Sequence, residues 1–212
     1  MLEIVSFTLG PAQTNAYLVA DSDTKEAVVI DPAWDGHIIL KAAQERGWRI
    51  GHLWYTHAHF DHIGGAAAIA DALNPLPLVV LHPNDHILWR AVGGGAIFGL
   101  AIDPGPEPTI DFVHGQKLKL GTYEFEVRFT PGHTAGHCIL YVASEKVCFC
   151  GDLIFNGSVG RADLPGGDWD QLVKSIKEHV FTMPDDTRLL SGHGPETTVR
   201  NERMNNPFVG GM

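Results

Sequence analysis

Four side chains of metal-ligand type lie within six consecutive positions in the segment THAHFDH, and this cluster constrains the chain more than any other feature. They are His57, His59, Asp61 and His62. Extended backbone places alternate side chains on one face, so His57 and His59 can reach one cation together. Asp61 and His62, in a turn that opens a helix, can point toward a neighbouring position. Singly, each has an ordinary interpretation, such as Asp61 as a helix N-cap. Together, they need a cation between them.

Three further candidate ligands each follow a glycine at the end of a predicted strand: His133 after Gly132, Asp152 after Gly151, and His193 after Gly192. Glycine lets a strand turn sharply and lets the backbone approach a bound group closely. At any one position the glycine could simply mark a turn. Its recurrence before a ligand, alongside the first cluster, predicts that these side chains lie on a common rim at the strand ends.

The seven candidates comprise five imidazoles and two carboxylates, which is too many for one metal ion. Two ions of coordination number four or five can use them if one carboxylate bridges the pair and a water or hydroxide takes the remaining position. Imidazole and carboxylate without thiolate suit Zn, Fe or Mn. We therefore expect two divalent metal ions, with zinc as the first choice and iron or manganese as alternatives.

The hydrophobic pattern predicts strands alternating with helices in the first half of the chain: strands at 2–9, 16–20, 27–30, 53–55 and 78–81, and helices at 38–46 and 63–73. Gly and Pro predict a long loop at 93–109, either a lid or a tolerated insertion. Alternating and apolar runs then predict strands at 118–120, 125–129, 139–142, 147–150 and 189–190, and helices at 169–180, after the cap Asp168, and 197–205. An irregular loop is expected up to Gly167. These elements predict an α+β sandwich, with face-to-face sheets covered by helices, in one domain over residues 1–212.

The formal net charge of −10 disfavours a nucleic-acid partner. The chain has no apolar run of 18 residues and its start lacks signal-peptide features, so we expect a soluble cytoplasmic protein with no membrane partner. Cys138, Cys148 and Cys150 are expected to be buried and unpaired. We expect a monomer or small homo-oligomer acting on a small molecule.

The order HxHxDH, a distant His, then GD and GH resembles the metallo-β-lactamase superfamily. The resemblance implies a four-layer αββα sandwich with a two-metal site on one edge. It implies that His57, His59 and His133 hold the first metal, that Asp61, His62 and His193 hold the second, and that Asp152 bridges them.

Three segments are similar to the glyoxalase II group, above all to its short, type II hydroxyacylglutathione hydrolases: TPGHTAGH at 130–137, NGSVGRADLPGGD at 156–168 and ERMNNPF at 202–208. This similarity implies a role in methylglyoxal detoxification by cleavage of S-2-hydroxyacylglutathione thioesters, such as S-D-lactoylglutathione, to glutathione and a hydroxy acid. Longer glyoxalase II enzymes grip glutathione with a separate C-terminal helical domain, which we do not expect here.

The leaving-group chemistry also favours a thioester. A thiol has a pKa of about 8.5 and leaves as thiolate without a general acid, whereas an amide nitrogen needs a proton donor. A metal lowers the pKa of bound water to about 7, and Asp61 and Asp152 would orient the resulting hydroxide. The alternative is a mononuclear iron glutathione-persulfide dioxygenase that uses His57, His133 and Asp152, but it leaves His62 and His193 without a role. A noncatalytic metal-binding protein leaves the whole site unused.

Arg161 is a candidate substrate contact, because a guanidinium pairs well with carboxylates. Its alternative role is a salt bridge to Asp163 that fixes the loop. His137 is expected to support the ligands rather than bind metal. The other histidines are expected to be surface or hydrogen-bonded residues: His37, His52, His82, His86, His114 and His179.

Overall fold

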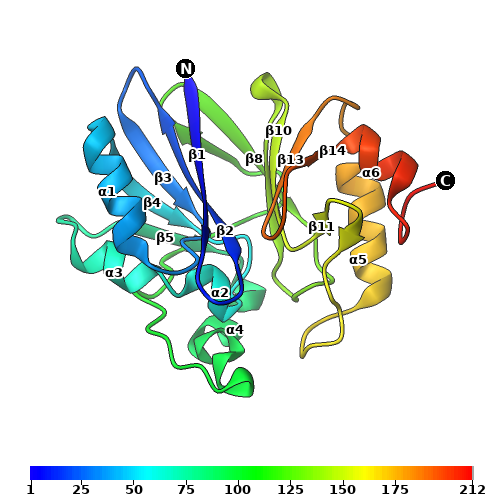
Figure 1. Ribbon diagram of the computed structural model, residues 1–212, viewed down its shortest axis with the longest axis horizontal. Coiled ribbons are helices and arrows are strands. Elements are labelled where there is room, and N and C mark those ends of the chain that lie inside the picture. The colour runs from blue at the N-terminus through cyan, green and yellow to red at the C-terminus, as the bar shows by residue number, and fades with distance from the viewer. Residues whose placement is uncertain (212) are drawn as a thin grey trace.

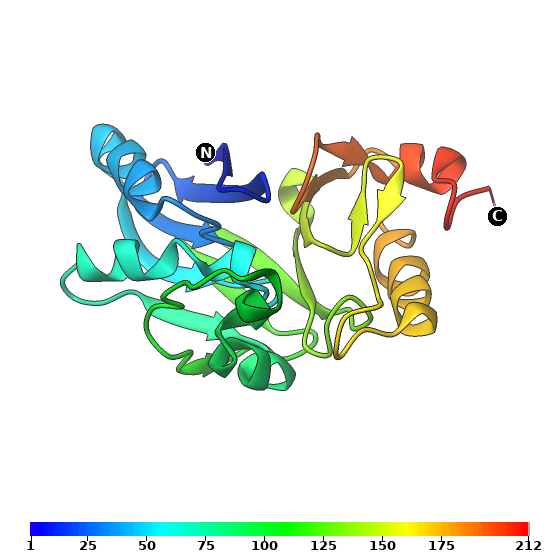
Figure 2. The same cartoon turned by 60° about the horizontal axis from the view of Figure 1, so that its bottom comes forward.

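The protein is described here by a computed structural model of residues 1–211, in which two six-stranded sheets face one another (Figures 1 and 2). The first sheet has the order β1 (Leu2–Leu9), β2 (Thr14–Asp21), β3 (Glu26–Ile30), β4 (Arg49–Trp54), β5 (Leu78–Leu81) and β6 (Ile110–Asp111). Its first three strands are antiparallel, and β3 to β6 are parallel.

The second sheet has the order β14 (Thr197–Thr198), β13 (Arg188–Ser191), β10 (Val147–Gly151), β9 (Cys138–Val142), β8 (Tyr123–Phe129) and β7 (Lys117–Leu120). Only β10 and β13 run parallel among its strands. A short hairpin, β11 (Ile154–Phe155) with β12 (Ser158–Val159), follows β10.

Helices cover the outer face of each sheet (Figure 1). The first sheet carries α1 (Gly36–Arg46) and α3 (Ala66–Asp71), and the second carries α5 (Trp169–Ser175), its continuation η4 (Ile176–Val180) and α6 (Val199–Asn205). Three buried apolar clusters fill the spaces between the four layers. Strand β2 illustrates how one sheet contributes to two of these clusters, because successive side chains of a strand point to opposite faces. It is buried along its whole length, with Leu18 facing the helices and Tyr17 and Val19 facing the second sheet. The predicted four-layer sandwich is confirmed.

Most predicted elements are present, and strands 2–9 and 78–81 have the predicted bounds. The predicted cap is also present, since Asp168 accepts a hydrogen bond from the backbone N–H of Gln171. Trp169 departs from the predicted buried face of that helix: it is 46% exposed, with its ring 6.5 Å from Phe208. In residues 1–211 no helix is long and apolar enough to cross a bilayer. The three cysteines are buried and free.

Glycine-rich segments are where the predicted elements were wrong. The helix expected at 63–73 is split into α2 (Phe60–Ile63) and α3, because Gly64 and Gly65 pack against the segment around Trp34. The loop expected at 93–109 begins with η2 (Val92–Phe98), a pair of 3₁₀ turns joined by left-handed glycines. A Cβ on Gly93 would lie 2.2 Å from the Phe60 nitrogen, so this glycine serves close packing rather than irregular structure.

The same edge of the molecule collects the ends of four strands. Strands β4, β8, β10 and β13 each end immediately before a segment that carries candidate ligands. The antiparallel strand β2 begins at this edge, where Thr14 forms an isolated bridge with His193. The sandwich therefore brings segments of both sheets to one place, close to α2 in Figure 1.

Candidate metal centre

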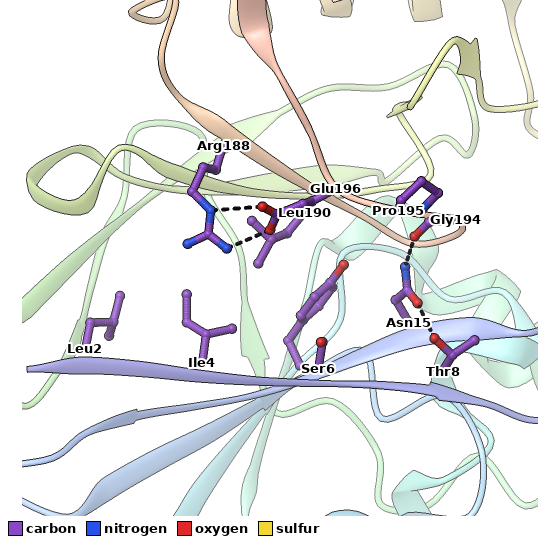
Figure 3. A pocket seen from close by; sticks show the side chains of 11 residues that line it. Leu2, Ile4, Ser6, Thr8, Asn15, Arg188, Leu190, Gly194, Pro195 and Glu196 are labelled. Carbon is purple, nitrogen blue, oxygen red and sulfur yellow. Dashed lines mark hydrogen bonds and ion pairs between the residues drawn. The ribbon is translucent and has the colours of Figure 1, made fainter. Parts of the chain in front are cut away.

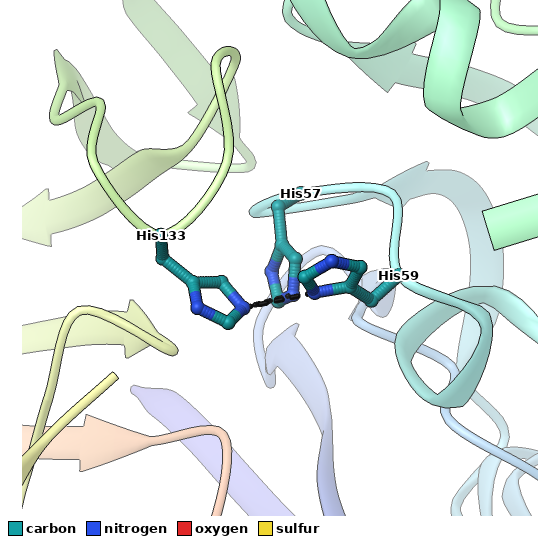
Figure 4. Close-up of side chains that lie close together, drawn as sticks. All are labelled: His57, His59 and His133. Carbon is teal, nitrogen blue, oxygen red and sulfur yellow. Dashed lines mark hydrogen bonds between the residues drawn. The ribbon is translucent and has the colours of Figure 1, made fainter. Parts of the chain in front are cut away.

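Three imidazoles, from His57, His59 and His133, converge on one point, and we call them the first trio (Figure 4). His133 Nε2 lies 2.9 Å from His59 Nδ1 and 3.2 Å from His57 Nε2. All three residues are buried. The loop after β4 supplies two of them and the loop between β8 and β9 supplies the third.

A second trio consists of Asp61, His62 and His193. The Asp61 Oδ2 atom lies 3.5 Å from His62 Nε2 and 3.3 Å from His193 Nε2. His193 is the most open residue of this trio, with 29% of its side chain exposed. Asp61 and His193 therefore lie nearer the surface, whereas His62 is as deeply buried as the first trio.

Asp152 lies between the two trios. Its Oδ1 is 3.3 Å from His62 Nε2, and its Oδ2 is 3.4 Å from His193 Nε2 and 3.6 Å from His133 Nε2. One carboxylate thus reaches side chains of both groups. All seven sequence-predicted ligands lie in a single cluster, with Asp152 in the position expected of a bridge.

Hydrogen bonds fix which nitrogen faces the centre in two imidazoles of the first trio, those of His57 and His133. The Thr56 hydroxyl donates to Asp31 Oδ2 at 2.6 Å and so accepts from His57 Nδ1 at 3.0 Å. His133 Nδ1 donates to the Arg161 carbonyl at 2.7 Å. The two Nε2 lone pairs therefore face each other across 3.2 Å, an arrangement that a shared cation stabilises.

Asp31 is a supporting residue that the sequence patterns did not identify. It is 2% exposed, and its carboxylate accepts from the backbone N–H of Thr56 at 2.7 Å and from His62 Nδ1 at 3.0 Å. The available signal was its place directly after the apolar strand β3, because parallel strands such as β3 and β4 end at the same edge. The hydrogen bond leaves His62 Nε2 free for the second trio.

Burial keeps the first trio neutral. It lowers the pKa of His57 well below its ordinary value, and the nearby His62 adds to the effect. It lowers the pKa of His59 to about 3, and the neighbouring imidazole of His133 is the next cause because two adjacent rings cannot both be protonated cheaply. The pKa of His133 is lowered by burial as well. Neutral imidazoles are the form that binds metals.

The second trio and Asp152 form a charged group. Burial opposes protonation of His62, but the charges of Asp152 and Asp61 outweigh it and raise the pKa well above its ordinary value. Burial likewise opposes protonation of His193, whose pKa the hydrogen bonds to Asp152 and Asp61 raise to about 9. Burial would raise the pKa of both carboxyls, but the charge of His62 holds them low. Protons and divalent cations therefore compete for these carboxylates.

The residues fit divalent cations on two further observations. His62 Nε2 and Asp152 Oδ1 are buried 3.3 Å apart without a well-aligned hydrogen bond to each other or to another described residue, which is costly unless a further group binds them. Gly192 leaves no room for a side chain, since a Cβ there would lie 2.1 Å from Asp152 Oδ1. An imidazole and carboxylate donor set of this kind suits Zn, Fe or Mn.

Each glycine that precedes a ligand is in close contact with a neighbouring segment. A Cβ on Gly132, whose φ is +137°, would lie 2.2 Å from the Leu172 nitrogen. One on Gly151, whose φ is +47°, would lie 2.3 Å from the Thr56 hydroxyl oxygen. The predicted role of these glycines, a sharp turn with close backbone approach, is confirmed at both positions.

His137 and Arg161 act as supports in this structure. The backbone N–H of Asp152 donates to His137 Nε2 at 3.2 Å. The ring proton of His137 is therefore on Nδ1, which donates to the Thr130 hydroxyl at 2.9 Å. The Arg161 guanidinium pairs with Asp163 through two bonds, of 2.7 and 2.8 Å. Substrate contact by Arg161 stays a prediction.

Asn15 supports the loop that carries His193. Its Nδ2 donates to the carbonyl oxygens of Ser191 at 3.0 Å and Gly194 at 2.8 Å, on either side of His193 in the chain. Figure 3 shows the bond to Gly194. Next to Asn15 lies a hollow of about 360 Å³ between β1 and the loop after β13. On the side of the hollow formed by β13 and the loop after it, Arg188 pairs with Glu196 at 2.6 Å.

Comparison with known proteins gives the same fold. The sequence matches the metallo-beta-lactamase superfamily over residues 9–193. Hydroxyacylglutathione hydrolase GloC of Haemophilus influenzae is 32% identical over 217 residues, which cover 98% of this chain and 97% of that protein. The crystal structure of BLEG-1 B3 metallo-beta-lactamase has a TM-score of 0.92 at 36% identity and covers 99% of this chain and 100% of its own. That of TTHA1623 in a di-iron-bound form has a TM-score of 0.87 at 40% identity, with coverages of 96% and 99%.

Proposed function

The chain belongs to the metallo-beta-lactamase superfamily, and we propose that within it the protein hydrolyses S-2-hydroxyacylglutathione thioesters such as S-D-lactoylglutathione. The observation that carries the proposal is the pair of trios joined by Asp152, which provides donors for two divalent cations. Its similarity to a hydroxyacylglutathione hydrolase over almost its full length supports this class of substrate.

Two divalent cations held here would lower the pKa of a coordinated water to about 7 and polarise the thioester carbonyl. The chain's own contribution is orientation. The Thr14 hydroxyl donates to Asp61 Oδ2 at 2.8 Å and fixes that carboxylate. Asp152 Oδ1 lies 3.3 Å from His62 Nε2 and its Oδ2 lies 3.4 Å from His193 Nε2, so both oxygens of this carboxylate face the positions that the cations would take.

The leaving group decides between thioesters and amides. A thiol with a pKa of about 8.5 departs as thiolate, so the site needs no proton donor beside the sulfur. The amide nitrogen of a β-lactam needs such a donor. We therefore expect S-D-lactoylglutathione to be a better substrate than a β-lactam, although one structural neighbour is a B3 metallo-beta-lactamase.

The resident metals are proposed to be zinc, with iron or manganese as alternatives. The neighbour TTHA1623 was crystallised in a di-iron-bound form, which supports iron as one of these alternatives. A mononuclear iron glutathione-persulfide dioxygenase is disfavoured because it would use His57, His133 and Asp152 and leave His62 and His193 idle. Cytoplasmic localisation and a role in methylglyoxal detoxification belong to the same proposal.

The test is a substrate panel with purified protein of measured metal content. We expect hydrolysis of S-D-lactoylglutathione, its loss in His59→Ala and Asp152→Ala, and near wild-type rates in His37→Ala, which alters an exposed residue of α1. Equal losses in all three variants would show that the site is misassigned. One iron per chain with oxygen uptake that depends on glutathione persulfide would replace the hydrolase by the dioxygenase.

A further inference from the structure

The turn that follows β5 attaches the loop of His133 to the first sheet. The ring of His82 stacks on Phe129 with centroids 4.2 Å apart, at the point where β8 ends. The side chain of Asn84 donates to the Ala135 carbonyl at 3.2 Å. These contacts join the first sheet to the second sheet at the edge where the ligands lie.

Asp85, in the same turn, binds both loops that carry the first trio. Its Oδ2 accepts from the backbone N–H of Ala58 at 3.1 Å and from the Thr134 hydroxyl at 2.8 Å. Its Oδ1 accepts from the backbone N–H of Gly136 at 2.6 Å. Ala58 lies between His57 and His59, and Thr134 follows His133 in sequence.

This carboxylate is 1% exposed, and the three hydrogen bonds come from uncharged donors. Burial raises its pKa, while the bond from Thr134 and those from the two backbone groups oppose that rise. The hydrogen bond from Gly136 to Asp85 is short because glycine lets the two backbones approach closely. A Cβ on Gly136 would lie 2.6 Å from the Asp85 nitrogen. A buried carboxylate that is held only by N–H and O–H groups fixes the positions of the backbone segments that it joins, because each of these bonds is costly to break.

We propose that Asp85 is a positioning residue for the first metal: it sets the separation of the two loops so that the imidazoles of His57, His59 and His133 face one point. The inference rests on the metal centre of the proposed function but not on the thioester as substrate. The second trio is held by other groups, Thr14 on Asp61 and Asp31 on His62. Asp85 should therefore influence one metal selectively.

The variant Asp85→Asn changes the hydrogen bonds with almost no change in shape. In either orientation of the amide, its NH₂ group faces a backbone N–H, of Ala58 or of Gly136, and one bond becomes a repulsive contact. We expect the affinity of the first metal to fall about 10–100-fold, as for other residues that orient metal ligands, with the second metal unaffected. Thr134→Val removes one of the three bonds and should shift the same affinity in the same direction by less.

The measurement is titration of metal-free protein with Zn²⁺ against a competing chelator, together with the Tm of the metal-free protein. Asp21→Asn is the matched control, because this buried carboxylate likewise accepts from uncharged groups, the backbone of Asp23 and the backbone and hydroxyl of Thr122. It lies at the opposite end of β2 from Thr14, which contacts Asp61. This variant should lower the Tm and leave both metal affinities unchanged.

Selective weakening of one metal in Asp85→Asn supports the proposal. Wild-type affinities for both metals in this variant, or equal weakening of both, overturn it. If Asp85→Asn does not fold, Thr134→Val decides in the same way. If the wild-type protein binds two metals and hydrolyses no thioester, the proposed substrate fails while the role of Asp85 stands. A wild-type protein that binds no metal overturns both.

Discussion

Three imidazoles of the cluster each use one ring nitrogen for a bond to the protein and leave the other for a ligand. His57 donates to Thr56, His62 to Asp31 and His133 to a backbone carbonyl. Such bonds select the tautomer and hold the ring, so they determine metal affinity almost as much as the ligands do. The supports come from segments remote from the ligand motif, which is why a search for His and Asp spacing does not find them.

Asp31→Asn is expected to reverse the tautomer of His62. The backbone N–H of Thr56 donates at 2.7 Å to Asp31 Oδ1, so the amide oxygen must take that position and the NH₂ must face His62 Nδ1. In the neutral imidazole, the form that binds metal, the ring proton then moves to Nε2, the atom that faces Asp61 and Asp152. We expect the affinity of the second metal to fall about 10–100-fold, measured by metal titration, with the tautomer read from ¹⁵N shifts of the ring. An unchanged Nδ1–H signal would contradict this reasoning.

At the scale of the elements, periodic patterns predicted strands well and glycine-rich segments poorly. Strand β5 is an apolar run with clear limits, so its bounds could be predicted from the sequence alone. The glycines of η2 indicated a loop, but Gly93 packs against Phe60 and permits helical turns. The roles of Asp31 and Asp85 could not be predicted, because each depends on contacts with segments 25 to 51 residues away in the chain.

The end of β2 provides a test of how elements of the two sheets are joined. The Asp21 carboxylate accepts from the backbone and hydroxyl of Thr122, in the turn between β7 and β8. The backbone hydrogen bond from Thr122 is the main cause that lowers the pKa of Asp21. A carboxyl with a lowered folded-state pKa contributes stability that is fully present above the unfolded pKa of about 3.9 and is lost as the pH falls through the folded value.

We therefore expect Asp21→Asn to lower the Tm by roughly 3–6 °C at pH 7, from the loss of charge-assisted hydrogen bonds. The difference from the wild type should shrink as the pH falls below about 4, because the wild-type carboxyl is then protonated in both states. The measurement is thermal unfolding of both proteins from roughly pH 2.5 to pH 7, a range that includes the titration of the Asp21 carboxyl in both states. A Tm difference that is the same at every pH would mean that the charge of Asp21 does not stabilise the contact.

At the scale of the whole molecule, the cluster draws its ligands from both halves of the sandwich. The segment after β4 of the first sheet supplies four of them, and the segments after β8, β10 and β13 of the second sheet supply His133, Asp152 and His193. The motif predicted which residues would meet. The motif did not predict the loop contacts that set the separation of the two sheets. These contacts are hydrogen bonds between residues far apart in the sequence, such as those that Asp85 accepts from Thr134 and Gly136.

Metal removal should therefore weaken the whole fold rather than one loop. Cations bound by ligands from both sheets stabilise the folded state only, since the ligands are scattered along the unfolded chain. At a free metal concentration of about 1,000 times Kd, one ion contributes about 4 kcal/mol, which corresponds to roughly 8–16 °C in Tm for a chain of this size. We expect a chelator to lower the Tm by at least this amount and added Zn²⁺, Fe²⁺ or Mn²⁺ to restore it. His193→Ala, which removes a ligand of the second trio only, should retain part of the shift. A Tm that does not respond to the chelator would show that no cation links the two sheets.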